Sequence, residues 1–154
     1  MARQARRISK TGLYHIIFRG VNQCSLFEES EDFEKLLELL AIVKSDLGYK
    51  VHAYCLMNNH VHLFIHEQSP ADITLIMKRV LCTYAYWFNK KYKRSGALIA
   101  NRYKSTCVEN DEYLLTLTRY IHQNPLNAGL VKDLEKYRWN SYRDYIKKRP
   151  RIIN

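Results

Sequence analysis

The segment His60-Val61-His62 has the spacing best suited to chemistry in this sequence. Residues two apart on a β-strand point to the same face, so a strand over residues 60–67 would project both imidazoles together. Two neighbouring imidazoles can bind one divalent cation, while a third ligand and the substrate complete its coordination shell. Two partly exposed surface histidines would give the same pattern, and the spacing alone does not separate these alternatives. His60 and His62 are therefore candidate metal ligands.

Tyr120 and Asn124 form a second pair, at the end of a predicted helix. Residues four apart are neighbours on one helical face. A tyrosine hydroxyl can attack phosphorus when a metal ion polarises the phosphate, and an asparagine carbonyl oxygen is a suitable ligand for Mg²⁺ or Mn²⁺. Taken alone, the pair is explained more simply if Tyr120 packs against a sheet and Asn124 caps the helix end. The chemical interpretation makes Tyr120 a candidate nucleophile and Asn124 a candidate third metal ligand.

Periodicity and turn signals predict the elements that would position these side chains. Alternating apolar residues predict strands over residues 13–19, 50–57, 60–67 and 102–109. Apolar spacings of three and four predict helices over residues 30–47, 70–93, 111–124 and 141–148. Pro125 is expected to stop the third of these helices. Asn58-Asn59 is expected to form a tight hairpin turn with positive φ angles.

The order β-α-β-β-α-β-α suits an antiparallel sheet. The expected class is α+β, with a ferredoxin-like antiparallel sheet and helices packed on one face. The chain has no internal repeat and no linker long enough to separate two domains. We therefore expect a basic N-terminal arm over residues 1–10, one folded domain over residues 11–148 and a C-terminal tail over residues 149–154.

Positive charge is concentrated in the middle of the chain. The 154 residues include 25 Lys and Arg against 15 Asp and Glu, which gives a net charge of +10. No acidic residue lies between Ile73 and Val108, whereas residues 28–46 are rich in them. This asymmetry predicts one face that attracts a phosphate backbone and another that repels it. Charge and position select six candidate DNA contacts: Arg3, Arg6, Arg7, Arg19, Arg102 and Lys104.

Membrane and secretory classes are disfavoured. No apolar run approaches the ~20 residues that a transmembrane helix needs, and the first residues lack the apolar stretch of a signal peptide. Four cysteines are too widely spaced for the usual zinc sites and fit free thiols in a cytosolic chain: Cys24, Cys55, Cys82 and Cys107. The expected protein is a cytoplasmic domain that binds nucleic acid and has no membrane partner.

Several motifs, in this order, resemble one family. Residues 58–63 resemble the HUH motif, two histidines flanking one apolar residue, of single-tyrosine HUH transposases, the IS200-like family. Residues 120–131 resemble the block that begins at the catalytic tyrosine in the REP-associated tyrosine transposase branch. Residues 15–20 and 101–105 also resemble that branch. The similarity extends from about Leu13 to Tyr145, which is nearly the whole chain.

The resemblance implies a fold, an activity and a site. It implies that residues 11–148 are a metal-dependent endonuclease and strand transferase that acts on single-stranded DNA. By this analogy Tyr120 attacks a phosphodiester and forms a 5′-phosphotyrosine link, while His60, His62 and Asn124 hold Mg²⁺ or Mn²⁺. Family members recognise DNA hairpins and often dimerise, so single-stranded or hairpin DNA and a second copy of the chain are the expected partners.

Two other functions compete with cleavage. A domesticated hairpin-binding module would keep the fold without cutting DNA, but the sequence disfavours it because His60, His62, Tyr120 and Asn124 are all present. Metal-dependent hydrolysis of a small substrate would need a carboxylate beside the histidines. Glu67 lies on the opposite face of the predicted strand, which disfavours this reaction.

Overall fold

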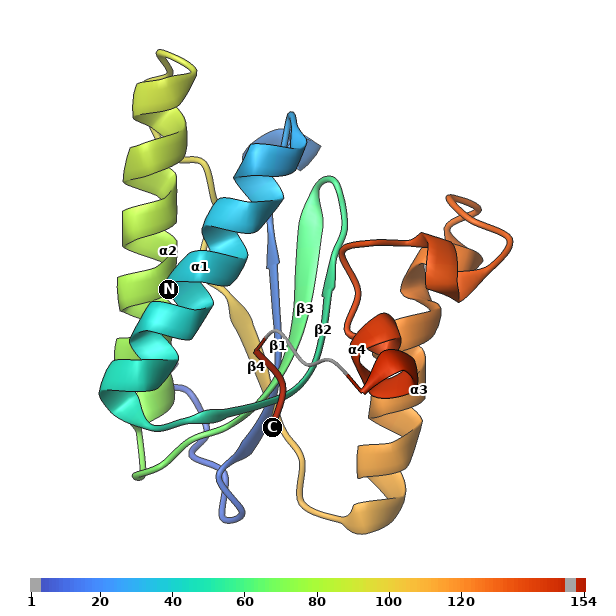
Figure 1. Cartoon of the computed structure of the whole chain (residues 1–154). Helices are drawn as coiled ribbons and strands as arrows, with labels where there is room; N and C mark the ends of the chain where they lie inside the picture. Colours follow the sequence, from blue (N-terminus) through green and yellow to red (C-terminus); the bar gives the residue numbers. More distant parts are fainter. Residues whose placement is uncertain (1–3, 149–151) are drawn as a thin grey trace.

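A four-stranded antiparallel sheet forms the centre of the protein, with strand order β2-β3-β1-β4. The computed structural model describes residues 4–148 and 152–154. The strands are β1 (Leu13–Arg19), β2 (Lys50–Leu56), β3 (His60–His66) and β4 (Lys104–Cys107). The helices are α1 (Ser30–Leu47), α2 (Asp72–Lys91), α3 (Asp111–Asn127) and α4 (Tyr142–Lys147), with short 3₁₀ turns η1 (Val21–Gln23) and η2 (Leu134–Lys136). Figure 1 shows helices on both sides of this sheet.

Helices α1 and α2 cover one face of the sheet. Alternate residues of β3, among them Val61, Leu63 and Ile65, are fully buried in the core that these helices share with the sheet. Because a strand points successive side chains to opposite faces, His60 and His62 must then lie on the other face. The predicted alternation of β3 is therefore confirmed.

Helix α3 lies on the opposite face, over β2 and β3 (Figure 1). Leu117 and Ile121 of α3 pack on Ala53, Cys55 and Phe64 of the sheet. The predicted α+β class with an antiparallel sheet is confirmed, but helices cover both faces rather than one. The physical reason is that β2 and β3 also present apolar side chains on this second face, namely Ala53, Cys55 and Phe64, and these need cover. The part of this face formed by β1 and β4 is different, because Ile17 is half-buried and Lys104 is exposed there.

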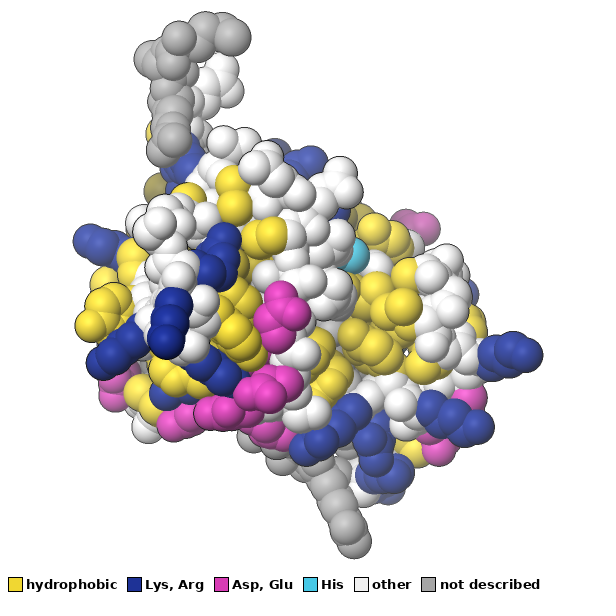
Figure 2. Space-filling model, turned by 90° about the horizontal axis from the view of Figure 1, so that it is seen from above, with side chains coloured by type: hydrophobic (Ala, Val, Ile, Leu, Met, Phe, Trp, Pro, Cys, Tyr) yellow, Lys and Arg dark blue, Asp and Glu magenta, His cyan; other side chains and the backbone are white. Residues whose placement is uncertain are grey.

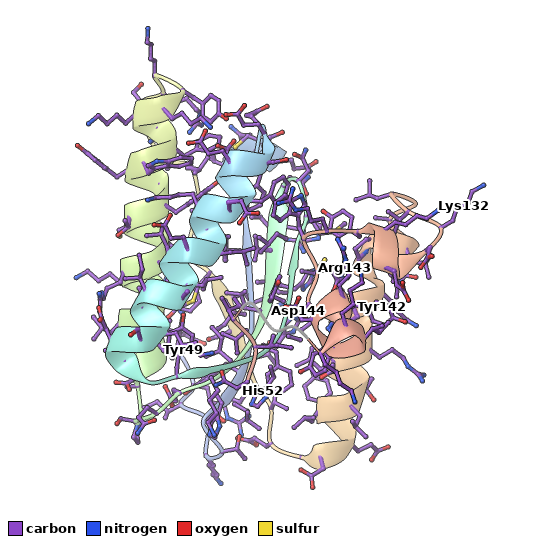
Figure 3. The ribbon with its side chains drawn as sticks, in the orientation of Figure 1. Tyr49, His52, Lys132, Tyr142, Arg143 and Asp144 are labelled. Carbon is purple, nitrogen blue, oxygen red and sulfur yellow. The ribbon has the colours of Figure 1, made fainter. Side chains whose placement is uncertain are left out.

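Helix α4 joins the α3 side of the sheet through polar contacts. The Tyr54 hydroxyl donates to Asp144 Oδ2 at 3.1 Å, and the backbone N–H of Ser141 donates to the Tyr54 carbonyl at 3.0 Å. In Figure 3 the labelled α4 residues lie beside α3, while Lys132, on the segment between the two helices, extends away from the sheet. The contacts from Tyr54 tie α4 to β2, an edge strand of the sheet.

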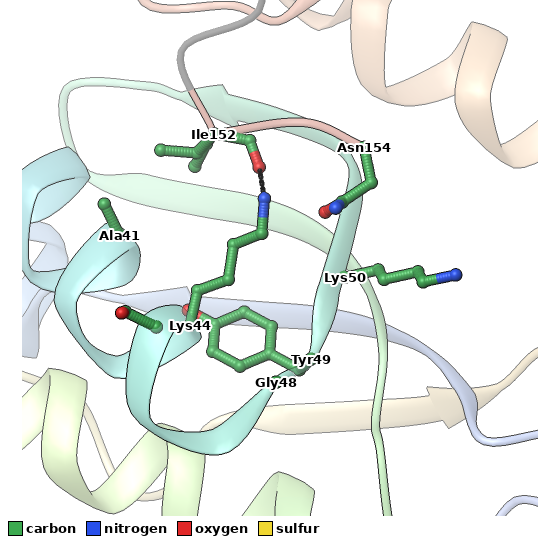
Figure 4. Close-up of a pocket in the computed structure, with 8 residues that line it drawn as sticks. Ala41, Lys44, Gly48, Tyr49, Lys50, Ile152 and Asn154 are labelled. Carbon is green, nitrogen blue, oxygen red and sulfur yellow. Dashed lines mark hydrogen bonds between the residues drawn. The ribbon is translucent and has the colours of Figure 1, made fainter.

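The last described residues lie against the start of β2. The Asn154 N–H donates to the Val51 carbonyl at 3.0 Å, and Lys44 Nζ donates to the Ile152 carbonyl at 2.6 Å. Lys44, Ile152 and Asn154 line a cavity of about 400 Å³, which is shown in Figure 4. The N-terminal arm and the C-terminal tail expected from the sequence fall partly outside the described residues, since residues 1–3 and 149–151 are not described.

Two local predictions are wrong, the helix end at Pro125 and the positive φ angles of Asn58-Asn59, whereas the predicted hairpin itself is present. Helix α3 continues through Pro125 to Asn127, because only one backbone bond is lost and the Ala128 N–H donates to the Asn124 carbonyl at 3.0 Å. The hairpin between β2 and β3 closes with a bond from the Met57 N–H to the His60 carbonyl at 2.8 Å. Neither Asn58 nor Asn59 has a positive φ in this turn.

Acidic and basic surfaces adjoin rather than oppose one another. Helices α1 and α2 pack side by side, and Lys91 of α2 donates to the buried Asp32 of α1 at 2.7 Å. Arg79 of α2 likewise pairs with Asp46 of α1 at 2.6 Å. Figure 2 shows acidic and basic side chains next to each other on one side of the molecule. The predicted division into an attracting and a repelling face is therefore wrong, because the sequence did not tell which helices are neighbours.

Candidate functional site

His60 and His62 project together from β3 on the face that carries α3. Their ring centroids are 5.1 Å apart and the rings are nearly perpendicular, at 81°. His62 is 2% exposed and His60 is half-buried. The strand therefore supplies two adjacent imidazoles, one enclosed and one reachable from solvent.

Helix α3 brings Tyr120 and Asn124 to these histidines within the same chain. Ile121 and Pro125 are buried and anchor the helix in the core. Tyr120 and Asn124, which directly precede them, therefore lie at the edge of the helix beside β3. Asn124 Nδ2 lies 3.2 Å from His62 Nε2, and the Tyr120 ring centroid lies 5.6 Å from that of His62. Tyr120 is 48% exposed, so the fold does not enclose this residue. One chain thus assembles all four residues that the sequence pairs suggested.

His15 also belongs to this cluster, although sequence reasoning missed it. His15 lies on β1, and its Nε2 is 3.1 Å from Nδ1 of His62. The two rings stack at 5.4 Å and 15°, and the edge of the Tyr120 ring lies 6.3 Å away. Alternation in β1 puts His15 on the same face as Arg19, and this signal could have indicated it once β1 was known to neighbour β3.

Burial keeps the three imidazoles neutral. It lowers the pKa of His62 to about 3, with further contributions from His15, His60 and Arg19. Burial and then the Lys104 charge lower the pKa of His15 to about 4. The pKa of His60 is also lowered, by burial and by Arg19, while contact with Asn124 opposes the shift. At neutral pH each ring therefore has one nitrogen lone pair available for a metal ion or a hydrogen-bond donor.

The donors that converge here suit a divalent cation without carboxylate ligands. Within residues 4–148 and 152–154, no three His, Cys, Asp or Glu side chains form a group that could hold a metal ion. A third protein ligand would therefore be an amide, and Asn124 is the amide in contact with His62. Two neutral imidazoles and a carbonyl oxygen are acceptable ligands for such a cation. Because this donor set carries no negative charge, an anionic substrate would have to balance the cation.

Three of the candidate DNA contacts surround the open end of the site. Arg19, Arg102 and Lys104 are exposed and line one cavity of about 260 Å³. Arg19 also lines a neighbouring cavity of about 630 Å³ together with Asn59 and His60. Among the residues that the structure describes, none with an acidic side chain lines either cavity. A phosphate backbone could therefore approach His60 along a positively charged border.

The other candidate contacts lie elsewhere. The Arg6 guanidinium stacks 3.6 Å from the centre of the Tyr103 ring and donates to its carbonyl at 3.0 Å. Arg7 is exposed and pairs with Glu109 at 2.9 Å. Arg3 lies outside the described residues. Arg6 and Arg7 therefore lie at the outer edge of the sheet, beside the segment that carries β4.

Other polar residues near the motifs have structural partners. His122 is buried, and its Nε2 lies 2.7 Å from Ser141 Oγ, on the side of α3 away from Tyr120. Glu67 is buried and accepts from the Tyr14 hydroxyl at 3.1 Å and the Ile73 N–H at 3.0 Å. The latter contacts support the expectation that Glu67 is not an acid or base beside the histidines.

Among the described residues, no helix is both long and apolar enough to cross a membrane.

Solved structures share this fold. A REP-associated tyrosine transposase bound to a REP hairpin superposes with a TM-score of 0.81 at 17% identity, covering 100% of this chain and 92% of that one. A chain from Deinococcus radiodurans R1 assigned as a transposase gives a TM-score of 0.53 at 17% identity, covering 79% of this chain and 94% of that one. At these identities the likeness shows the fold alone. Among curated proteins, none matches this sequence.

The family is shown by the sequence itself. The family model described as "Transposase IS200 like" matches residues 9–124, from the residues before β1 to Asn124 of α3. This range contains His60, His62 and Tyr120, and it covers more than half of the chain. The chain therefore belongs to the IS200-like transposase family.

Proposed function

We propose that this chain is a metal-dependent single-stranded DNA endonuclease and strand transferase that cleaves hairpin-bearing sites through a 5′-phosphotyrosine intermediate. One observation carries the proposal: the half-exposed Tyr120 stands beside the neutral His60–His62 pair and Asn124 in a single chain. A nucleophile next to a cation-binding group is the arrangement that phosphoryl transfer needs. Its predicted assembly as a homodimer stays a prediction.

In this proposal Tyr120 Oη attacks the phosphorus of one phosphodiester. The bond from Tyr120 to the 5′-phosphate forms as the bond to the 3′-oxygen breaks, and that oxygen ends as a free hydroxyl after taking up a proton. A different 3′-hydroxyl can then attack the phosphotyrosine, which rejoins the DNA and restores Tyr120. Because the number of ester bonds to phosphorus is unchanged, the reaction needs no nucleotide cofactor.

The roles of the surrounding residues follow from their positions. His60, His62 and Asn124 would hold Mg²⁺ or Mn²⁺, which supplies charge stabilisation at the phosphate oxygens when it is bound. The rings of His62 and His15 meet the Tyr120 ring at 87° and 80° and support its position beside the sheet. Since Tyr120 is half-exposed, a long DNA strand would reach it without entering a deep pocket.

The DNA partner is proposed from charge and from one relative. Arg19, Arg102 and Lys104 border the site, where they would contact the phosphates next to the cleaved bond. The REP-associated transposase with the same fold was solved with a REP hairpin, and we extend that class of partner to this chain. Arg6, Arg7 and Arg3 of the basic arm are proposed to contact more distant phosphates.

A covalent-adduct experiment tests this function. Purified protein is incubated with a labelled single strand that contains a hairpin, with Mg²⁺, with Mn²⁺ or with a chelator, and is then separated under denaturing conditions. We expect a protein–DNA adduct with either metal and none with the chelator. Tyr120→Phe should lose the adduct but bind the DNA as tightly as wild type, and Tyr142→Phe serves as a matched control. An adduct formed by Tyr120→Phe would exclude Tyr120 as the nucleophile.

The alternative is a domesticated hairpin-binding module that does not cleave DNA. The same experiment separates the two, because a non-cleaving module would bind the hairpin strand and form no adduct with any metal. In that case the histidines would be part of a binding surface, and substitution of Tyr120 would change affinity rather than chemistry.

A further inference from the structure

The Asn59 amide determines where the proton of His60 lies. His60 Nδ1 is 2.8 Å from Asn59 Oδ1. A carbonyl oxygen can only accept a hydrogen bond, so Nδ1 of His60 carries the proton. In a neutral imidazole the other nitrogen then has the lone pair. Nε2 of His60 is therefore the nitrogen left available as a ligand.

The Asn124 amide determines the state of His62 in the same way. Nδ2 of Asn124 is an NH₂ group, which can only donate, and it lies 3.2 Å from Nε2 of His62. Nε2 of His62 consequently accepts, and its Nδ1 carries the proton. That proton points at Nε2 of His15, 3.1 Å away, so His15 accepts at Nε2. His60 and His62 thus each have Nδ1–H bonded to an acceptor and a lone pair on Nε2.

The two acceptors are themselves held in place. His15 lies on the central strand β1, is 7% exposed, and stacks on His62 across the β1–β3 ladder. The turn that carries Asn59 is fixed by a bond from the Gly20 N–H to the Asn59 carbonyl at 3.0 Å. A side chain at Gly20 would disturb this segment, because a Cβ there would lie 2.2 Å from the Cys24 carbonyl oxygen. Fixed acceptors can fix the orientation of the rings that donate to them.

We propose that His15 and Asn59 are positioning residues, which orient His62 and His60 and select the tautomers that present Nε2 to the metal ion. This inference rests on the proposed metal site and adds two residues that do not themselves touch the metal. Without the acceptors, each ring could turn about its side chain or place its proton on Nε2. Removal of such a partner of a ligating histidine commonly lowers metal affinity about 10–100-fold.

The first test needs no variant and no metal. Long-range ¹H–¹⁵N correlation spectra of the metal-free protein identify the protonated nitrogen of each histidine. We expect His60 and His62 to carry the proton on Nδ1, and His15 to accept at Nε2. A proton on Nε2 of either His60 or His62 would overturn the proposal. Because neither DNA nor cleavage is involved, this result is independent of whether the protein proves to be an endonuclease.

The second test removes each acceptor and measures Mn²⁺ binding by electron paramagnetic resonance. His15→Phe keeps an aromatic ring but loses the acceptor, and Asn59→Ala loses the amide. We expect each to raise the dissociation constant for Mn²⁺ about 10–100-fold. His15→Gln and Asn59→Asp keep an acceptor oxygen and should restore most of the affinity. His66→Phe, on the same face of β3 but outside this set of contacts, is the matched control.

The variants also separate positioning from ligation. With Co²⁺ bound, the exchangeable Nδ1–H protons of ligating histidines give strongly shifted proton resonances. Two such resonances are expected in wild type, and His15→Phe should retain the His60 signal while that of His62 moves or broadens. Three resonances in wild type, with one lost outright in His15→Phe, would show that His15 is itself a ligand. Wild-type Mn²⁺ affinity in both His15→Phe and Asn59→Ala would likewise refute the proposal.

Discussion

The amide nitrogen of Asn124 lies 3.2 Å from Nε2 of His62, although 62 residues separate them in the chain. This contact joins α3 to β3 at the point where the proposed nucleophile and the proposed metal ligands meet. Tyr120 stands one helical turn before Asn124, so the same helix brings both residues to β3. A single chain therefore contains the complete candidate site.

Asn124 can be tested without changing the tyrosine. Asn124→Ala removes the amide from His62, and we expect Mn²⁺ affinity to fall at least about 10-fold, because two imidazoles remain as the only protein ligands. Asn124→Gln keeps an amide one bond longer and should retain part of the affinity. Titration with Mn²⁺ measures both, and adduct formation at saturating metal measures the consequence for cleavage. Unchanged metal affinity in Asn124→Ala would remove Asn124 from the site.

Arg19, Arg102 and Lys104 are expected to act as a group on DNA affinity. Each phosphate contact with a single strand contributes about 0.7 to the slope of log affinity against log salt concentration. Replacing all three by alanine should therefore reduce this slope by about 2 and weaken binding most strongly at low salt. Fluorescence anisotropy over a range of salt concentrations measures the slope. Lys132→Ala, on the segment that extends away from the sheet, is the control and should leave the slope unchanged (Figure 3).

Local patterns predicted most of the fold. The bounds of β1 and α1 agree with the sequence prediction residue for residue, because each segment carries its own period and its own end signal. Helix α1, for example, ends at Gly48, which adopts a left-handed φ of 70°. The face shared by His60 and His62 was likewise readable, since alternation along one strand needs no knowledge of the other strands.

What could not be predicted depends on which elements become neighbours. His15 looked like an ordinary polar residue of a strand, and its role emerges only because β1 lies between β3 and β4. The pairing of the acidic α1 with the basic α2 was hidden for the same reason. Each helix shows which of its faces is apolar, but this periodicity does not say which other helix will lie beside it. Long-range order of strands and helices was thus the missing information.

Stability should depend on pH through the buried histidines. The pKa values of His15 and His122 are lowered to about 4, and that of His62 to about 3, by burial, whereas unfolded histidines titrate near 6.5. Between these values the unfolded chain binds protons that the folded chain does not, so the free energy of unfolding must fall as pH decreases below about 6.5. Each histidine contributes a slope of about 1.4 kcal/mol per pH unit.

Urea denaturation between pH 7.5 and 5, in the presence of a chelator, measures this slope. His122 does not contact the candidate metal ligands, and His122→Gln keeps a group able to bond Ser141. This substitution should reduce the slope by about 1.4 kcal/mol per pH unit. Equal stability at pH 7.5 and pH 5 would contradict the prediction, as would a slope that His122→Gln leaves unchanged.

Two lysines should separate stability from DNA binding. Lys91 Nζ contacts the fully buried Asp32 at 2.7 Å and also pairs with Glu29 and Glu31, so its charge is already used within the fold. Lys91→Met leaves the Asp32 carboxylate without its cation and should lower the free energy of unfolding. The effect of this substitution on DNA affinity should be slight, because three carboxylates already neutralise the Lys91 ammonium group and weaken its attraction for a phosphate.

Lys104→Met should behave in the opposite way. Lys104 is exposed beside Arg19 and Arg102, so its loss should change stability by no more than about 0.5 kcal/mol but weaken DNA binding and reduce its salt dependence. Urea denaturation and fluorescence anisotropy on the two variants form a complete comparison. If both substitutions weakened DNA binding equally, the DNA would have to contact the α1–α2 side of the molecule as well. The basic border around His60 would then not be the docking surface by itself.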